Sequence, residues 1–187
     1  MVLGEFQVAN LSDEMFNDGL LFTELAKQTE NDFERWRYFR TSIMSFCSSA
    51  EAWVSKQIHL NLSNRDSLTE DEQGVLDFLE TPNKKMPNGF TSIKKRLYNF
   101  LPVSFDPEKS IGENNPKIER YIELSQMRNV IVHYSKKDFY KLYGTELERY
   151  ALEAPAIIEE LFNEYRAIYP EILDAHWFRN RKSRVIE

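Results

Sequence analysis

One short segment, residues 128–134 (R-N-V-I-V-H-Y), combines an arginine, an asparagine and a histidine within an otherwise apolar stretch. Histidine titrates near neutral pH, so it can accept and return a proton. Arginine stays charged and binds phosphate through its planar guanidinium, while an amide can orient either group. RNA supplies its own nucleophile, the 2′-hydroxyl, so its cleavage requires only proton transfer, positioning and charge stabilisation. These residue types therefore point to phosphodiester chemistry without a metal ion.

The spacing of the three residues is compatible with one helix. Asn129 and His133 are four positions apart, about 40° around a helix, and share a face. Arg128 lies about 140° from His133, so its long side chain has to swing around the helix. A break near Ser135 would ease this convergence. The structural alternative is an arginine in an ordinary salt bridge and a histidine satisfied near the core.

Helical periodicity dominates the rest of the chain, and strand patterns are weak. Apolar residues recur every three or four positions from Phe33 to Val54, which predicts a central core helix. Residues 102–115 are expected to form a long connection. Pro155 is expected to kink the last helix or to mark its start. Three capping boxes predict helix starts: Asn31 with Glu34 opens the long core helix, Thr69 with Glu72 opens a short helix, and Thr145 with Glu148 opens a helix that ends before Pro170. The other predicted helices are Ser12–Gln28, Ser92–Leu101, a helix from Pro116 to about Tyr134, and a separate short helix that begins in the segment from Ser135 to Asp138.

Length and composition limit the architecture to one helical domain. The chain has 187 residues, with 6 glycines, 7 prolines and 13% aromatic residues. This is too little turn chemistry for an all-β fold and too much apolar mass for disorder. We expect an all-α, up-down helical bundle with short additional helices over residues 1–175, followed by a basic C-terminal tail, 176–187.

The charge balance argues against a protein that coats nucleic acid through bulk charge, because such domains are usually basic. The formal net charge is −6. Residues 1–80 carry 6 basic and 15 acidic side chains, whereas residues 81–187 carry 18 and 15. An anionic partner is therefore expected to meet the second half, at one basic groove on a mostly acidic surface.

A basic run in the second half is the candidate RNA-binding surface. Residues 83–100 hold five basic side chains and no acidic one. The alternative is an ordinary solvated charged face. The candidate RNA-binding residues are Lys84, Lys85, Lys94, Lys95 and Arg96.

Other chemistries find little support in the sequence. Cys47 is the only cysteine, and its place in the apolar pattern predicts a small buried side chain rather than a nucleophile. The three histidines are far apart, and no metal or cofactor is implied. No apolar stretch approaches the ~20 residues that cross a bilayer, and no signal peptide is visible, so we expect a soluble, cytoplasmic protein.

The segment 128–133 resembles the signature of the HEPN superfamily: an arginine, a polar residue that is often asparagine, and a histidine four to six positions after the arginine. The context is similar too, because HEPN domains are helical bundles in which this motif comes late and a further long helix follows. An earlier long helix of such domains commonly carries an acidic residue facing the motif, and Glu51 occupies the matching place. The resemblance covers roughly Phe33 to Tyr169.

This resemblance implies a metal-independent endoribonuclease that acts as a homodimer, with both motifs lining one cleft. Arg128 and His133 would be catalytic, Asn129 would position them, and Glu51 would support the site. Many members of the superfamily are toxins or phage-defence effectors, some paired with a nucleotidyltransferase antitoxin. The alternative function is a catalytically inactive helical module that binds a nucleotide or a protein partner.

Overall fold

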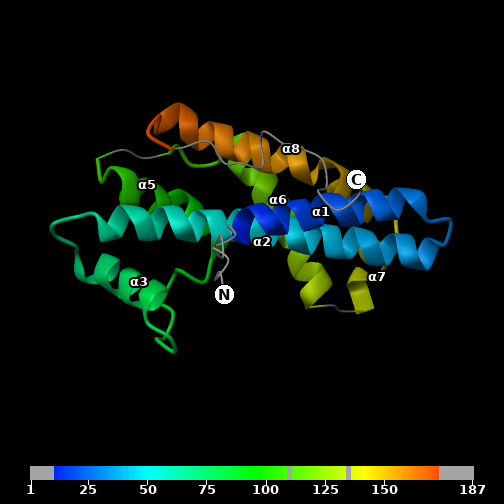
Figure 1. The fold of residues 1–187 in the computed structure, drawn as a ribbon, viewed down its shortest axis with the longest axis horizontal. Helices are drawn as coiled ribbons and strands as arrows, with labels where there is room; N and C mark the ends of the chain where they lie inside the picture. Colours follow the sequence, from blue (N-terminus) through cyan, green and yellow to red (C-terminus); the bar gives the residue numbers. More distant parts are fainter. Residues whose placement is uncertain (1–10, 109–110, 134–135, 173–187) are drawn as a thin grey trace, which may run out of the picture.

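The computed structural model describes residues 11–108, 111–133 and 136–172, in which helices are joined by loops and turns, with no strand among them (Figure 1). The all-α prediction is thereby confirmed. The predicted tail, 176–187, lies outside the described residues. No helix in the described part of the chain is long and apolar enough to span a membrane. The elements are α1 (Leu11–Gln28), α2 (Asp32–Ser63), α3 (Glu70–Glu80), α4 (Ile93–Lys95), the π-helical turn η1 (Arg96–Phe100), α5 (Leu101–Phe105), α6 (Pro116–Val132), the 3₁₀ turn η2 (Lys136–Asp138), α7 (Phe139–Leu142) and α8 (Thr145–Ile168).

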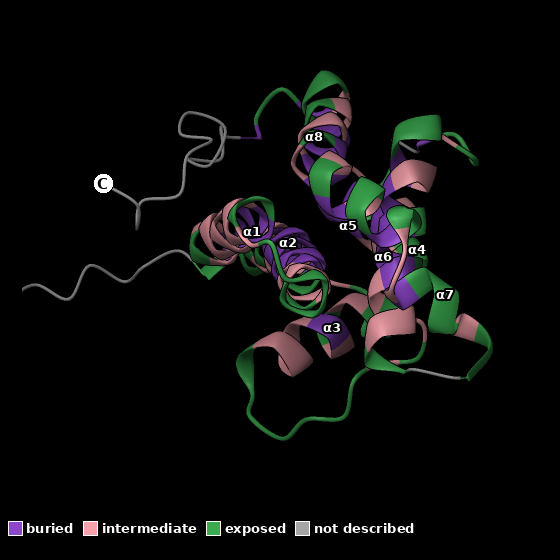
Figure 2. Ribbon diagram, turned by 90° about the vertical axis from the view of Figure 1, so that its right-hand side faces the viewer, coloured by how far each residue is buried: buried purple, intermediate pink, exposed green. Residues whose placement is uncertain are grey.

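Helix α2 is the long axis of the molecule, and the other helices pack around it (Figure 1). Helix α1 lies against its first half, α8 covers one side, and α6 packs against both α2 and α8. Helices α3 and α5 flank the second half of α2. The buried residues of α2, α6 and α8 face one another between these helices (Figure 2). A charged side chain in the middle of α2 can therefore reach α6, which carries the motif.

The capping chemistry explains most helix starts. The Asn31 side chain accepts hydrogen bonds from the backbone of Phe33 and Glu34 at the start of α2. Thr69 and Glu72 form the full reciprocal capping box that opens α3. These starts confirm the predicted ones, because side-chain capping is a local interaction that the sequence displays directly.

Several local predictions were wrong. The Glu34 carboxylate accepts a hydrogen bond from the Thr29 hydroxyl, at 2.9 Å, so it does not complete a capping box with Asn31. Thr145 is the first residue of α8 and caps nothing, since Gly144 occupies the cap position. Of the two expectations for Pro155, a kink or the start of the last helix, the start is wrong, because Pro155 lies inside α8.

The apolar stripe and the long connection also differ from expectation. Phe33, in the first turn of α2, is 71% exposed, so the predicted apolar stripe is not buried over its whole length. The predicted connection 102–115 is shorter, since α5 continues to Phe105. Pro102 is tolerated there because it lies in the first turn of that helix.

The crossing of α1 and α2 requires a glycine at position 19. A Cβ built on Gly19 would lie 2.7 Å from the ring of Phe46, which is fully buried. The Gly19 carbonyl also accepts hydrogen bonds from Thr23 at 2.8 Å and from Ser42 at 3.0 Å. The two helices are thus held together by close backbone approach as well as by apolar packing.

We expect Gly19→Ala to lower the free energy of unfolding by about 1–3 kcal/mol, since Phe46 has no space into which it can move. Chemical denaturation monitored by circular dichroism measures the change. Gly74→Ala in α3 is the matched control, because the nearest atom outside its helix is Pro87 Cγ, at 3.9 Å from the added Cβ. That variant should gain about 0.5–1 kcal/mol. Equal stability of wild type and Gly19→Ala would contradict the close approach.

Candidate functional site

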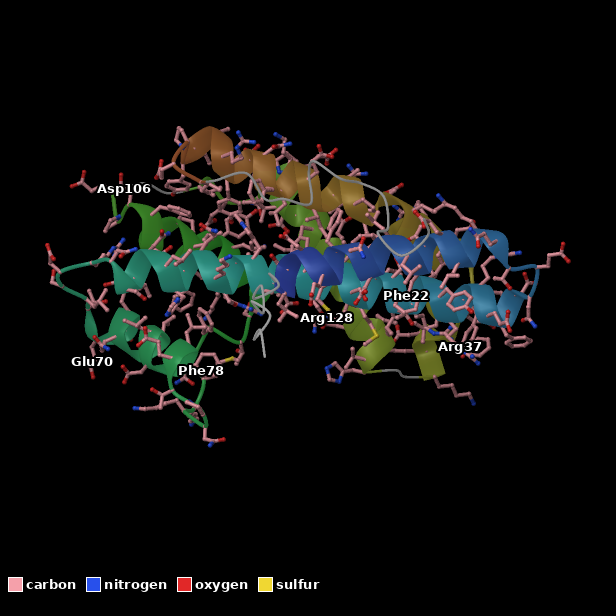
Figure 3. The ribbon with its side chains drawn as sticks, viewed as in Figure 1. Phe22, Arg37, Glu70, Phe78, Asp106 and Arg128 are labelled. Carbon is pink, nitrogen blue, oxygen red and sulfur yellow. The ribbon has the colours of Figure 1, made fainter. Side chains whose placement is uncertain are left out.

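A carboxylate shared by two arginines lies at the centre of the candidate site. Glu51, in the middle of α2, accepts hydrogen bonds on Oε1 from Nη2 of Arg128 and on Oε2 from Nη2 of Arg96, the latter at 2.9 Å. Figure 3 shows Arg128 beside the middle of α2. We call Glu51, Arg96 and Arg128 the arginine–glutamate cluster. It joins α2, η1 and α6 and carries a net charge of one positive unit.

The cluster is largely shielded from water. The side chains of Arg96, Glu51 and Arg128 are 12%, 21% and 26% exposed. Nε of Arg96 is buried and has no hydrogen-bond partner among the described residues. Its guanidinium carbon lies 5.6 Å from the centre of the Phe90 ring. Low exposure strengthens charge interactions, so the net positive charge is favourable for an anion that approaches the cluster.

Cys47 lies one helical turn before Glu51, and its side chain is buried. Burial, followed by the negative charge of Glu51, raises the pKa of the thiol to about 12. The Tyr121 hydroxyl, which donates to the Cys47 carbonyl at 3.4 Å, also has a pKa well above its ordinary value because it is fully buried. Both groups stay protonated and pack the inner side of the cluster. The prediction that Cys47 is a buried side chain is confirmed.

The exposed part of the motif lies at the end of α6. The helix stops at Val132, and His133 is its cap residue, with its backbone N–H donating to the Asn129 carbonyl at 2.8 Å. The break expected near Ser135 therefore occurs at His133. The side chains of Asn129 and His133 are exposed.

The motif residues do not converge within one chain. No hydrogen bond joins the side chains of Arg128, Asn129 and His133 among the described residues. Arg128 points inward to Glu51, whereas Asn129 and His133 face solvent. The structural alternative foresaw an arginine in a salt bridge and a histidine near the core. The salt bridge is observed, but the buried histidine is not.

The five candidate RNA-binding residues fall into separate groups. Arg96 turns inward to Glu51, so placing it with exposed lysines was wrong. Lys84 and Lys85 lie in the loop after α3, where Lys84 pairs with Asp77 at 3.3 Å. Lys94 pairs with Glu119 at 3.0 Å, and Lys95 is exposed beside it. The linear run separates because α4 leads directly into η1, whose first residue faces the core.

Two larger cavities lie away from the motif. One, of about 680 Å³, is lined by Lys94, Lys95 and Tyr98 with residues of the loop before α6. The other, of about 620 Å³, lies between α2, α3 and α5 and has Arg65 and Glu72 at its wall. Neither is lined by Arg128, Asn129 or His133. Among the described residues, the Lys94–Lys95 cavity is the counterpart of the expected basic groove, and the motif does not line it.

Other candidate ligands are few in the described part of the chain. His59 is partly exposed and contacts Glu80 at 3.0 Å. No group of three histidine, cysteine, aspartate or glutamate side chains there could hold a metal ion.

Arg96 is the site residue whose role sequence reasoning missed. It was placed in the basic run because it directly follows Lys94 and Lys95 in a segment without acidic residues. A linear sequence does not show that it faces Glu51, 45 positions earlier. Its one local signal is the apolar pair Leu97 and Leu101, which marks this segment as packed against the core.

Comparisons with known proteins found no matching family model, no similar curated sequence and no similar solved structure.

Proposed function

We propose that this protein is a HEPN-like, metal-independent endoribonuclease that uses Arg128 and His133. The observation that carries the proposal is the pairing of Arg128 with Glu51 on the central helix, while His133 of the same motif is exposed at the helix end. An acidic residue facing the motif is the arrangement that the HEPN resemblance implies. The motif offers a histidine that can transfer a proton and, five positions earlier in the chain, an arginine that can bind phosphate.

The chemistry is a transfer within the RNA strand. The 2′-oxygen attacks the adjacent phosphorus and forms a new O2′–P bond, while the P–O5′ bond breaks. One group accepts the 2′ proton and another returns a proton to the departing 5′-oxygen, and His133 performs one of these transfers. Arg128 stabilises the charge that grows on the phosphate oxygens, and Asn129 positions the two catalytic residues. The products are a 2′,3′-cyclic phosphate and a 5′-hydroxyl.

Arg96 allows Arg128 to bind phosphate without leaving a bare carboxylate behind. Removing one partner of a buried pair is costly when the other charge is left alone. Here Glu51 keeps Arg96 at 2.9 Å when Arg128 turns to the substrate. Glu51 and Arg96 therefore position Arg128 and do not themselves react.

A homodimer would complete the site. His133 is exposed, and one chain presents only one such histidine at the end of α6. Two copies related by a twofold axis would place two histidines and two arginines in one cleft, and these would supply both proton transfers. An antitoxin or a nucleotidyltransferase partner, and a role as a toxin or phage-defence effector, belong to the same proposal.

A catalytically inactive module that binds a nucleotide or a protein partner is the second candidate. The observation that favours it is the inward orientation of Arg128, which is 26% exposed and engaged by Glu51. In this function the cluster is a structural link between α2, η1 and α6.

RNA cleavage in the presence of a chelator tests the proposal. The full chain is expected to cut single-stranded RNA in EDTA and to leave cyclic phosphate ends. His133→Ala should lower the rate by about 10²–10⁴-fold, because general acid–base catalysis is lost. His59→Ala is the matched control and should retain the wild-type rate, since the His59 side chain pairs with Glu80 at the second half of α2, outside the motif. A wild type that binds RNA but never cleaves it would support the inactive module instead.

A further inference from the structure

A row of aromatic side chains lies on the surface formed by the start of α2 and by α7. Successive ring centres are 5.7, 5.4, 4.8 and 5.9 Å apart. The row connects two segments more than a hundred residues apart in the sequence, through the contact between Trp36 and Tyr143. We call it the aromatic row; in spatial order its members are Phe33, Trp36, Tyr143, Phe139 and Tyr140.

The two end rings are open to solvent. Phe33 is 71% exposed and Tyr140 is 84% exposed. Three of the four ring pairs meet edge to face, at interplanar angles of 87°, 89° and 87°. Edge-to-face packing holds the rings in place without stacking them on one another. The end rings are therefore fixed in position, while most of their surface remains free for a flat ligand.

Unpaired cations border the aromatic row. Arg37 lies four positions after Phe33 and so on the same face of α2; Figure 3 shows it on the part of α2 next to α7. Lys136 and Lys137 immediately precede α7 and are exposed. None of the three forms an ion pair within the described part of the chain. Arg40 stands over the Tyr143 ring, 5.0 Å from its centre.

The neighbouring acidic groups, in contrast, already have partners. Asp32 pairs with Arg35 at 2.9 Å, and Glu34 accepts a hydrogen bond from Thr29 at 2.9 Å. Asp138 lies 4.0 Å from Lys141. The Thr29 hydroxyl is neutral, so Glu34 keeps its negative charge, but Arg37, Lys136 and Lys137 outnumber it. The net charge left for an incoming ligand beside the exposed rings is therefore positive. This combination binds single-stranded nucleic acid, because bases stack on the rings and phosphates contact the cations.

We infer that the aromatic row binds single-stranded RNA, with unpaired bases stacked on Phe33 and Tyr140 and phosphates against Arg37, Lys136 and Lys137. The inference rests on the proposed function and names its substrate class. Turn η2 and α7 follow His133 closely in the chain, so a strand held at His133 can continue onto the row. Duplex RNA does not fit, because its bases are already stacked on one another.

Binding is measured with the full chain carrying His133→Ala, so that the RNA stays intact. The probes are a short fluorescein-labelled single-stranded RNA and its duplex, followed by fluorescence anisotropy. Tyr140→Ala and Phe33→Leu should each weaken single-strand binding by about tenfold and leave duplex binding unchanged. Tyr140→Trp should retain binding, because a stacking surface is preserved. Leu60→Ala removes an exposed apolar side chain elsewhere on α2 and is the control.

Two results would overturn the inference. One is equal single-strand binding by the parent and both ring variants. The other is a change of oligomeric state in Tyr140→Ala, seen by light scattering, with RNA binding intact, because the row would then be a protein interface. Failure of the proposed ribonuclease function gives a different result from failure of this inference. A chain with His133 present that binds single strands through the row but cuts none would contradict the ribonuclease and leave the row's role standing.

Discussion

The Arg128→Ala variant is expected to cleave RNA about a hundredfold to a thousandfold more slowly than the wild type, while remaining folded. The rate falls because the guanidinium that stabilises the phosphate charge in the transition state is absent. The fold survives because Glu51 keeps its hydrogen bond to Arg96. Single-turnover cleavage rates and thermal unfolding by circular dichroism measure the two effects separately. Arg128→Lys should recover only part of the rate, since lysine lacks the planar fork that grips phosphate.

Arg120→Ala is the matched control for this change. Arg120 lies on the same helix, α6, and also pairs with carboxylates, Glu153 at 3.3 Å and Glu160 at 2.8 Å. It is two helical turns from Arg128 and should leave the cleavage rate unchanged. Equal losses of rate in both variants would mean that any positive charge on α6 supports cleavage, and the specific role of Arg128 would be refuted.

The Glu51→Ala variant is expected to lose about 2–3 kcal/mol of unfolding free energy. This is a larger loss of stability than the one expected for Arg128→Ala. Removing the shared carboxylate leaves two guanidinium groups facing each other with little access to water. The melting temperature should fall by roughly 5 °C or more. Double replacement with Arg96→Met should restore part of the stability, because one of the two facing charges is then gone.

Glu153 provides the matched control, because it is also a glutamate paired with two arginines but is more exposed to water. It too is shared by two arginines, Arg120 at 3.3 Å and Arg149 at 3.2 Å, but it is 34% exposed. Water screens this arrangement, so Glu153→Ala should cost less than about 1 kcal/mol. If Glu51→Ala proves as mild as Glu153→Ala, the cluster is a surface ion pair and does not fix the position of Arg128.

The fold was predictable from the sequence where the information is local. The Thr69–Glu72 capping box and the Asn115-Pro116 start of α6 each depend on residues that are close together in the sequence, and both are observed. The Thr145 capping box was wrong because the pattern T-x-x-E also fits a threonine at the first helical position. The exposure of Phe33 could not be foreseen, because periodicity shows which residues share a face and does not show which of them another element covers.

The candidate site was predictable in its motif and only partly in its geometry. The contact of Glu51 with Arg128 follows from the HEPN resemblance and is observed, although their catalytic roles remain predictions. Arg96 and Lys95 are adjacent in the chain and look alike as sequence, yet one is inward and the other exposed. Three-dimensional packing decides such a difference, because it depends on how η1 is oriented against α2.

The π-helical turn at Arg96–Phe100 sets this orientation. A π turn holds one residue more than an α-helical turn, so the side chains before it are rotated by about 100° relative to those after it. The extra residue changes the side-chain direction between Arg96, which faces Glu51, and Leu101, which is buried at the start of α5. Deleting one residue here would therefore change the direction of the preceding side chains more than the length of the helix. The backbone would form a regular α-helix, and Arg96 would turn away from Glu51.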